Sequence, residues 1–213
     1  MKICEIFHSL QGESYLAGRP CTFVRTAGCN LSCSWCDTRY AGATNEAEDM
    51  TVGQVMQRVG ELGADLVQIT GGEPLLQEES IELMRLLCDS GARVMLETNG
   101  TLDITPVDPR VIIVMDVKAP SSGHPDTNRW ANLEVLQDSD EIKVVLSDRA
   151  DYDWAKATLG EKGVIRKYRV TFSPVFGAID YKTLAEWLLA DRLPVRMGFQ
   201  LHKLIWGPDA KGV

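Results

Sequence analysis

The alternation of short apolar runs with amphipathic helical stretches constrains this chain more than any other feature of its sequence. Most of the runs are continuous, as in parallel strands that are covered on both faces. Repeated along one chain, this β-α alternation predicts an α/β fold with a parallel sheet under helical cover. The predicted strands span residues 21–25, 66–69, 93–96, 111–115, 141–146, 168–172 and 195–201, with 3–7 as an edge strand or hairpin partner.

Helical patterns occupy the segments between these strands. Thr51 and Gln54 have the spacing of a capping box and precede a one-sided apolar pattern. A second helix is expected to stop near Gly91, and residues 152–159 and 181–189 predict two more. About seven strands in 213 residues fit a partial, open (β/α) barrel better than a closed eight-fold barrel, which typically needs about 250 residues.

Charge and hydropathy exclude several classes of protein. A net charge of −8 without a basic cluster argues against a general nucleic-acid binder. No apolar run approaches the roughly 18 residues of a membrane span, and the first residues do not resemble a secretory signal. We therefore expect a single cytoplasmic domain that acts on a small molecule or a protein.

Three cysteines within eight residues form the strongest functional motif. Cys29, Cys33 and Cys36 have the spacing C-x3-C-x2-C and follow the first predicted barrel strand. Iron–sulfur clusters are held by cysteine thiolates, usually four to a cluster. Three local ligands would leave one iron of a [4Fe-4S] cluster open to a substrate or cofactor.

A structural zinc site is the alternative interpretation of this motif, with Cys21 or a histidine as fourth ligand. Cys21 lies at the far end of the preceding strand, roughly 25 Å away at about 3.3 Å per residue. The spacing therefore favours the cluster and leaves zinc open. Cys4, Cys21 and Cys88 are expected to be core residues, because free cysteines are commonly buried.

Polar residues follow the ends of four predicted strands. The carboxyl ends of parallel strands meet at one edge of a barrel, so these residues predict an active-site face. Arg25 can bind a carboxylate through its planar fork, although an ordinary ion pair is the simpler role. The polar segment 119–132 fits either a functional loop or a solvated connection. The four strand-end segments are 70–74, 97–101, 116–121 and 173–175.

The cysteine motif with Trp35, together with Gly71-Gly72-Glu73-Pro74, resembles the radical S-adenosylmethionine (SAM) superfamily. More narrowly, the chain resembles the 7-carboxy-7-deazaguanine synthases of queuosine and deazapurine biosynthesis from its first residues to its last. Its cysteine spacing is the short form found across the superfamily. The narrower resemblance is carried by residues 5–13, 23–25, 36–38, 70–75, 97–101, 116–123, 173–175 and 200–203.

The resemblance implies a lyase whose [4Fe-4S] cluster is held by Cys29, Cys33 and Cys36. SAM would chelate the open iron and yield a 5′-deoxyadenosyl radical that takes hydrogen from C6 of 6-carboxy-5,6,7,8-tetrahydropterin. The ring would contract to 7-carboxy-7-deazaguanine with loss of ammonia, and SAM would be regenerated. The implied SAM-binding residues are Trp35, Cys36, Asp37, Gly72, Glu73, Asp116, Val117, Lys118, Ser173, Pro174 and Val175.

The same resemblance implies Arg25, Glu13 and Thr38 as catalytic residues. Arg25 would bind the substrate carboxylate, and the Thr38 hydroxyl would bind a Mg²⁺ that also meets the substrate. An N-terminal extension of about residues 1–20 and a C-terminal tail of about 203–213 would cover the substrate. The implied substrate-binding residues are Leu10, Gln11, Gly12, Arg25, Thr70 and Val213.

The resemblance also implies an electron donor such as flavodoxin and a homodimer, with neither nucleic acid nor membrane as a direct partner. A glycyl-radical activase is the alternative within the superfamily, because it shares the cysteine spacing and the Gly-Gly-Glu-Pro segment. Such an activase needs a groove for a protein loop and has no use for Arg25 opposite a substrate carboxylate. The non-enzymatic alternative is a structural zinc module.

Overall fold

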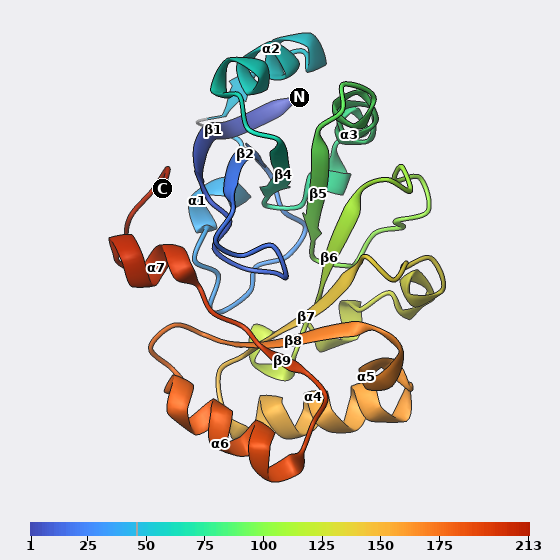
Figure 1. Cartoon of the computed structure of the whole chain (residues 1–213), viewed down its shortest axis with the longest axis vertical. Helices are drawn as coiled ribbons and strands as arrows, with labels where there is room; N and C mark the ends of the chain where they lie inside the picture. Colours follow the sequence, from blue (N-terminus) through green and yellow to red (C-terminus); the bar gives the residue numbers. More distant parts are fainter. Residues whose placement is uncertain (46) are drawn as a thin grey trace.

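One sheet of nine strands organises the computed structural model, which describes residues 1–45 and 47–213 (Figure 1). The strand order is β3-β1-β2-β4-β5-β6-β7-β8-β9, and β3 and β9 are its two free edges. Strand β2 and strands β4 to β9 pair in parallel, whereas β1 pairs antiparallel with β2 and β3. The open, partial barrel predicted from the sequence is therefore confirmed. The strands are β1 (Lys2–Leu10), β2 (Pro20–Thr26), β3 (Glu48–Asp49), β4 (Leu66–Gly71), β5 (Arg93–Thr98), β6 (Ile112–Val117), β7 (Glu141–Leu146), β8 (Arg169–Pro174) and β9 (Arg196–Met197).

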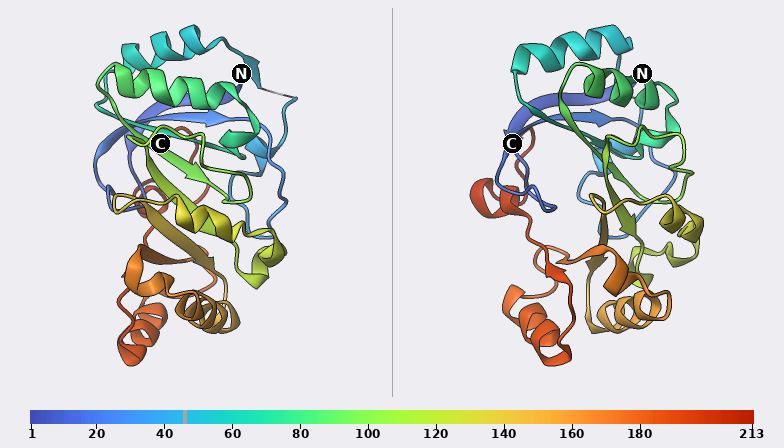
Figure 2. Two further views of the ribbon diagram at one scale, coloured as in Figure 1. Left: turned by 90° about the vertical axis from the view of Figure 1, so that its right-hand side faces the viewer. Right: turned by 45° about the vertical axis from the view of Figure 1, so that its right-hand side comes forward.

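Helices cover the outer face of the curved sheet (Figure 2). Helices α2 and α3 contact the β1–β5 end, and α4 and α5 contact β7 and β8. The predicted capping box of α2 is confirmed, because the Thr51 hydroxyl accepts from Gln54 N at 3.2 Å and Gln54 Oε1 accepts from Thr51 N at 2.7 Å. The helices are α1 (Arg39–Gly42), α2 (Val52–Leu62), α3 (Glu79–Asp89), α4 (Arg149–Glu161), α5 (Val164–Lys167), α6 (Tyr181–Asp191) and α7 (Leu201–Trp206), with short 3-10 helices η1 (Pro74–Leu76), η2 (Pro120–Ser122), η3 (Pro125–Thr127) and η4 (Trp130–Glu134).

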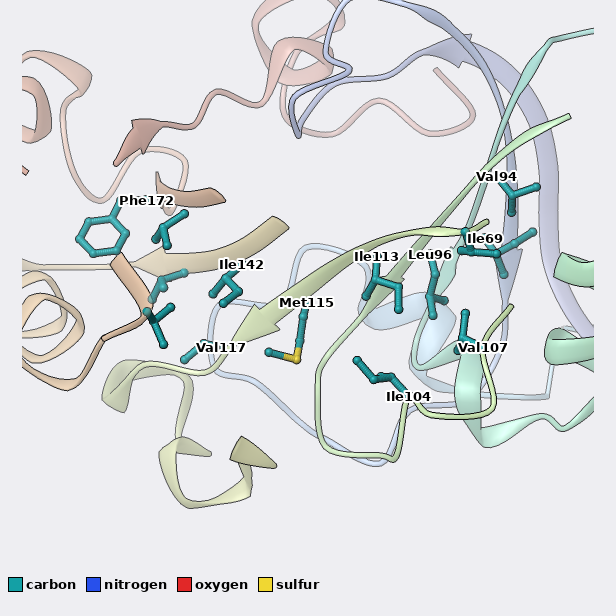
Figure 3. Packing of buried hydrophobic residues seen from close by; sticks show 14 of the residues in the cluster. Ile69, Val94, Leu96, Ile104, Val107, Ile113, Met115, Val117, Ile142 and Phe172 are labelled. Atoms are coloured by element: carbon teal, nitrogen blue, oxygen red, sulfur yellow. The ribbon is translucent and has the colours of Figure 1, made fainter. Parts of the chain in front are cut away.

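The two faces of the sheet differ in chemistry because side chains alternate along each strand. Ile69, Leu96 and Phe172 belong to the outer set, which packs against the helices as the main core (Figure 3). On the inner face, the strands begin with a smaller apolar cluster that includes Phe23 and Met95. Toward the carboxyl ends this inner face becomes polar, which places hydrophilic groups inside the barrel. The polar inner positions are Arg25, Gln68, Thr70, Glu97, Asp116, Lys143 and Ser173.

The last predicted strand, 195–201, is wrong in its length. Strand β9 ends at Met197, and the chain turns into helix α7 at Leu201. Gly198 explains the departure, because a Cβ there would lie 2.9 Å from side-chain carbons of Thr171 and Ser173. The chain crosses β8 closely at this glycine and then joins the N-terminal segment, where Leu201 N donates to Gly12 O at 2.9 Å.

The three cysteines outside the C-x3-C-x2-C motif differ in burial. Cys21 is fully buried as predicted, while Cys4 and Cys88 are half-buried. Within residues 1–45 and 47–213, no helix has the length and apolar character needed to cross a membrane.

Candidate active site

A cavity of about 960 Å³ opens at the carboxyl ends of the parallel strands. Three predicted site residues do not line it, namely Glu73, Val117 and Pro174. Side chains alternate between the two faces of a strand, so Val117 and Pro174 point away from the cavity because each follows an inward-facing residue. The cavity thus brings together most residues that the sequence assigned to a site. Those that line it are Leu10, Gln11, Gly12, Glu13, Arg25, Cys29, Cys33, Trp35, Cys36, Asp37, Thr38, Thr70, Gly72, Asp116, Lys118, Ser173, Val175 and Val213.

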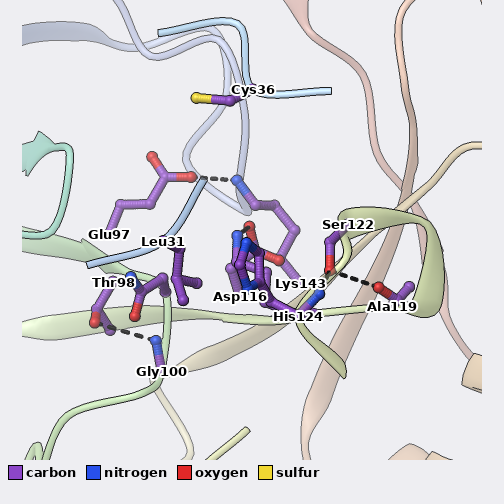
Figure 4. A network of polar contacts seen from close by, with 12 residues as sticks. Leu31, Cys36, Glu97, Thr98, Gly100, Asp116, Ala119, Ser122, His124 and Lys143 are labelled. Atoms are coloured by element: carbon purple, nitrogen blue, oxygen red, sulfur yellow. Dashed lines mark hydrogen bonds and ion pairs between the residues drawn. The ribbon is translucent and has the colours of Figure 1, made fainter. Parts of the chain in front are cut away.

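The cysteine loop is fixed by the segment 119–132, which the sequence left open between a functional loop and a solvated connection. Ser34 N donates to Ser122 O at 3.2 Å, and Trp35 Nε1 donates to Ser121 Oγ at 3.0 Å. Ser32 N donates to His124 Nε2 at 3.1 Å. Figure 4 shows Ser122 and His124 beside the site. The segment is therefore a structured support for the cysteine loop.

The three thiols of this loop line one side of the cavity. Leu31 N and Asn99 Nδ2 lie 3.4 and 3.9 Å from Cys29 Sγ as donors. Burial raises the pKa of the Cys33 thiol, and the nearby Lys118 ammonium lowers it in part. Within the described residues, no three His, Cys, Asp or Glu side chains stand in an arrangement that could hold a metal ion.

The Gly71-Gly72 turn packs directly against the root of the cysteine loop. Glu73 N donates to Gly28 O at 2.8 Å, and Gly72 N donates to Thr26 O at 3.2 Å. A Cβ at Gly72 would collide with the Gly28 carbonyl and lie 2.9 Å from Cys29 Cβ, so only glycine permits this approach. The sequence indicated exposed backbone at this turn, and the structure adds contact between two backbones.

The Glu73 carboxylate lies in the core and not at the cavity wall. One oxygen accepts from Leu75 N at 3.0 Å and from the Thr98 hydroxyl at 2.9 Å, and the other accepts from Asn99 N at 2.7 Å. Burial raises the pKa of Glu73, and these donors oppose that shift. In this conformation the side chain joins the strand ends of β4 and β5 instead of offering a free carboxylate.

Arg25 is an inward-facing residue of β2 and is held by an acid and two aromatic rings. Its Nε donates to Glu5 Oε1 at 2.7 Å, and the Tyr40 hydroxyl donates to the same oxygen at 2.9 Å. Its guanidinium lies 5.9 Å from the Phe7 ring centroid. Among the described residues none hydrogen-bonds its two terminal nitrogens, which remain available to a ligand in the cavity.

Two lysines that the sequence reasoning did not assign to the site lie on the same wall. Lys143 Nζ contacts Glu97 Oε1 (Figure 4). The same Nζ lies 3.1 Å from Glu13 Oε2. The sequence carried a signal for Lys143, because it interrupts the apolar run of β7. Its inward direction depends on strand register, which the sequence does not specify. Near it, Lys203 Nζ bonds Asp37 Oδ2 at 2.5 Å and ties the C-terminal segment to the cysteine loop.

Asp116 and Lys118 form a buried ion pair at 2.8 Å beside Trp35. The Lys118 ammonium lies 5.3 Å from the Trp35 ring centroid, within reach of a cation–π interaction. Asp116 Oδ1 is buried and has no hydrogen-bond partner among the described residues. Asp116 therefore offers a hydrogen-bond acceptor to a ligand, and Trp35 offers an aromatic face.

Comparison with known proteins agrees with this geometry. Residues 23–116 match the model of the radical SAM superfamily. The chain is 49% identical to the 7-carboxy-7-deazaguanine synthase of Chlorobaculum tepidum, over 100% of this chain and 97% of that protein. It is 44% identical to the synthase of Koribacter versatilis over the full length of both. The crystal structure of QueE from Escherichia coli superposes with a TM-score of 0.77 at 24% identity, covering 94% of each chain.

An open parallel barrel with three cysteines on the loop after its first parallel strand defines a radical SAM enzyme. The full-length identity to curated relatives is more specific. The chain belongs to the 7-carboxy-7-deazaguanine synthase family.

Membership of the superfamily implies a [4Fe-4S] cluster and SAM, and the site is compatible with both. The three cysteine side chains line one large cavity. Two nitrogen donors lie near the Cys29 sulfur, and the thiolates of protein-bound iron–sulfur clusters accept hydrogen bonds of this kind. Asp116 Oδ1, which no described residue hydrogen-bonds, fits a cationic or hydrogen-bonding ligand beside the loop. The residues present therefore fit the two groups.

Proposed function

We propose that this enzyme converts 6-carboxy-5,6,7,8-tetrahydropterin into 7-carboxy-7-deazaguanine with loss of ammonia, in a Mg²⁺-dependent reaction. The observation that carries the proposal is one cavity that holds both the three-cysteine loop and the Arg25 guanidinium. When bound, the reduced cluster and SAM supply the radical that begins the reaction. An anaerobic turnover assay with this pterin tests the proposal, and lack of product would refute it.

The residues of the chain would bind and orient the pterin in this cavity. Arg25 would take its carboxylate through the two terminal nitrogens. Gln11 and Gly12 would meet the ring from the N-terminal extension, which is tied to the start of α7 by the hydrogen bond from Leu201 N to Gly12 O. Thr70 would contact the substrate from the end of β4. Tail residues 208–213, Val213 included, line the cavity and would cover the bound substrate.

The remaining assigned residues would hold SAM. Trp35, Cys36 and Asp37 would present backbone groups to its adenine, and Gly72 would approach its aminoacyl end. Asp116 and Lys118 would complete the pocket with Ser173 and Val175. An external one-electron donor such as flavodoxin and a homodimer belong to the proposal through the family resemblance.

Replacement of Arg25 by lysine should lower catalytic efficiency with the pterin at least tenfold. Lysine keeps the charge but loses the planar fork that matches a carboxylate. A tenfold loss corresponds to about 1.4 kcal/mol. Full loss of the charge-assisted pair would cost about 2–4 kcal/mol in substrate binding or in the barrier. Steady-state kinetics and the SAM dissociation constant measure it. Affinity for SAM should stay near that of wild type, and equal losses for both ligands would point to damage of the fold.

The Mg²⁺ site is proposed at Thr38. This residue occupies the N-cap position of α1 but makes no side-chain capping bond, and its hydroxyl lies 3.8 Å from Cys36 Sγ. The hydroxyl is therefore not used to start the helix and lies at the cavity wall. One hydroxyl with substrate oxygens and waters suits Mg²⁺, which prefers oxygen ligands and retains water.

Replacement of Thr38 by valine should abolish most of the stimulation of turnover by Mg²⁺, because valine keeps the shape without the hydroxyl. Thr38→Ser should recover part of it. The measurement is turnover against added Mg²⁺, with iron content checked in each variant. A valine variant that Mg²⁺ stimulates as strongly as wild type would place the metal elsewhere.

A further inference from the structure

Lys143 is a buried cation on the inner face of β7, and the apolar pattern of that strand does not require it. Its neighbours Ile142 and Val144 face the main core, whereas the Lys143 side chain points into the barrel and is only 7% exposed. Charged groups are rarely buried to this extent unless they are paired. Its position at the cavity wall calls for a role beyond folding.

Two carboxylates from distant parts of the chain meet at this ammonium. Glu13 comes from the N-terminal extension and Glu97 from the carboxyl end of β5, and Lys143 Nζ contacts one oxygen of each. The three side chains all line the cavity. Lys143 therefore connects the extension to two strands of the barrel.

The second oxygen of each carboxylate is also held. Glu97 Oε2 accepts from Gln68 Nε2 at 2.8 Å, and Glu13 Oε1 accepts from Gln200 Nε2 at 3.1 Å. Each carboxylate is thus bound through both of its oxygens, which fixes its orientation. Burial of the Lys143 ammonium with two partly buried carboxylates is costly and is seldom the most stable way to fill an interior. Such groups are concentrated where a protein needs fixed polar atoms for a ligand.

We infer that Lys143 is a positioning residue that holds Glu13 and Glu97 as two ionised acceptors for N–H groups of the bound heterocycle. The inference rests on the proposed function, since a tetrahydropterin carries several ring and exocyclic N–H donors. A carboxylate accepts such bonds at both oxygens only when it is ionised. Without the ammonium, the two acids would lie close together without the charge that now bridges them, and their orientation toward the substrate would be lost.

The test compares Lys143→Met, which keeps an unbranched stem without charge, with Lys143→Arg. For Lys143→Met we expect at least a tenfold rise in the KM for 6-carboxy-5,6,7,8-tetrahydropterin, with a smaller change in kcat. Anaerobic equilibrium dialysis of the same pterin should show the same loss without turnover. Iron content and SAM affinity should match wild type, and Lys143→Arg should recover part of the binding.

Lys156→Met is the matched control. It also removes an ammonium paired with one carboxylate, Asp191 at 2.9 Å, but this pair is 28–35% exposed and outside the cavity. Pterin binding by this variant should equal that of wild type. A Lys143→Met enzyme that binds pterin like wild type, or that loses SAM and pterin equally, would overturn the positioning role.

A second experiment covers the case in which Lys143→Met alone fails to fold. It places the same substitution in a protein from which both acids have been removed. In Glu13→Gln/Glu97→Gln protein, no carboxylate is stranded, so Lys143→Met should fold and change pterin binding by less than about twofold, since it acts through groups already removed. A further tenfold loss in that background would refute the inference. A wild-type enzyme that neither binds nor converts the pterin would refute the proposed function itself, which the dialysis and turnover of wild type show first.

Discussion

Cys33→Ala should give a folded protein that holds no intact [4Fe-4S] cluster and has no measurable pterin turnover. Cys33 is the central ligand of a three-cysteine loop, and its loss leaves two thiolates for a cluster that usually takes four. The measurements are iron and acid-labile sulfide after anaerobic purification, the visible absorbance of the cluster, and turnover. Full iron content with normal turnover would contradict the assignment of Cys33.

Cys88→Ala is the control for cysteine removal. Cys88 is half-buried on α3 and packs against the main core, away from the cysteine loop. Its removal should leave the iron content and turnover at wild-type values. The only cost should be a small cavity, about 1 kcal/mol in the free energy of unfolding.

Glu73→Ala should destabilise the protein by about 3–5 kcal/mol, because each buried donor left without an acceptor costs about 1–3 kcal/mol. The fully buried carboxylate accepts from three donors, and alanine would leave Leu75 N, Asn99 N and the Thr98 hydroxyl without partners. Glu73→Gln keeps one acceptor oxygen and should cost less. Urea unfolding of the cluster-free protein, followed by circular dichroism, measures both.

The comparison for Glu73 is an acid of the same type at the surface. Glu82 is exposed in the first turn of α3, so Glu82→Ala should change the free energy of unfolding by no more than about 0.5 kcal/mol. A Glu73→Ala protein as stable as Glu82→Ala would show that the donors around Glu73 find other partners. In that case its role as ligand to the aminoacyl end of SAM would become the better explanation.

The sequence predicted the framework well because its signals are local. Apolar runs located the parallel strands, and Thr51 with Gln54 located the start of α2. The cysteine spacing located the loop that the cavity contains. In each case residues close in the chain carry the information, so no tertiary contact had to be known.

The parts that escaped prediction depend on distant contacts. Lys143 meets Glu13 across 130 residues, and Lys203 meets Asp37 across 166. Residues 195–201 have the composition of a strand, but the crossing of Gly198 over β8 ends it early. For Glu73, the sequence showed a carboxylate at a strand end. It could not show that Thr98 and Asn99 take up its oxygens.

The close packing of the cysteine loop against Gly71-Gly72 bears on how the enzyme is repaired. Gly28 N donates to Ala41 O at 2.7 Å, and Gly28 O accepts from Glu73 N, so backbone hydrogen bonds hold the root of the loop on both sides. In small zinc domains the metal and the fold are gained and lost together. Here oxidative loss of the iron would leave the root of the cysteine loop packed against Gly71-Gly72. The same protein molecule could then take up a new cluster without being synthesised or folded again.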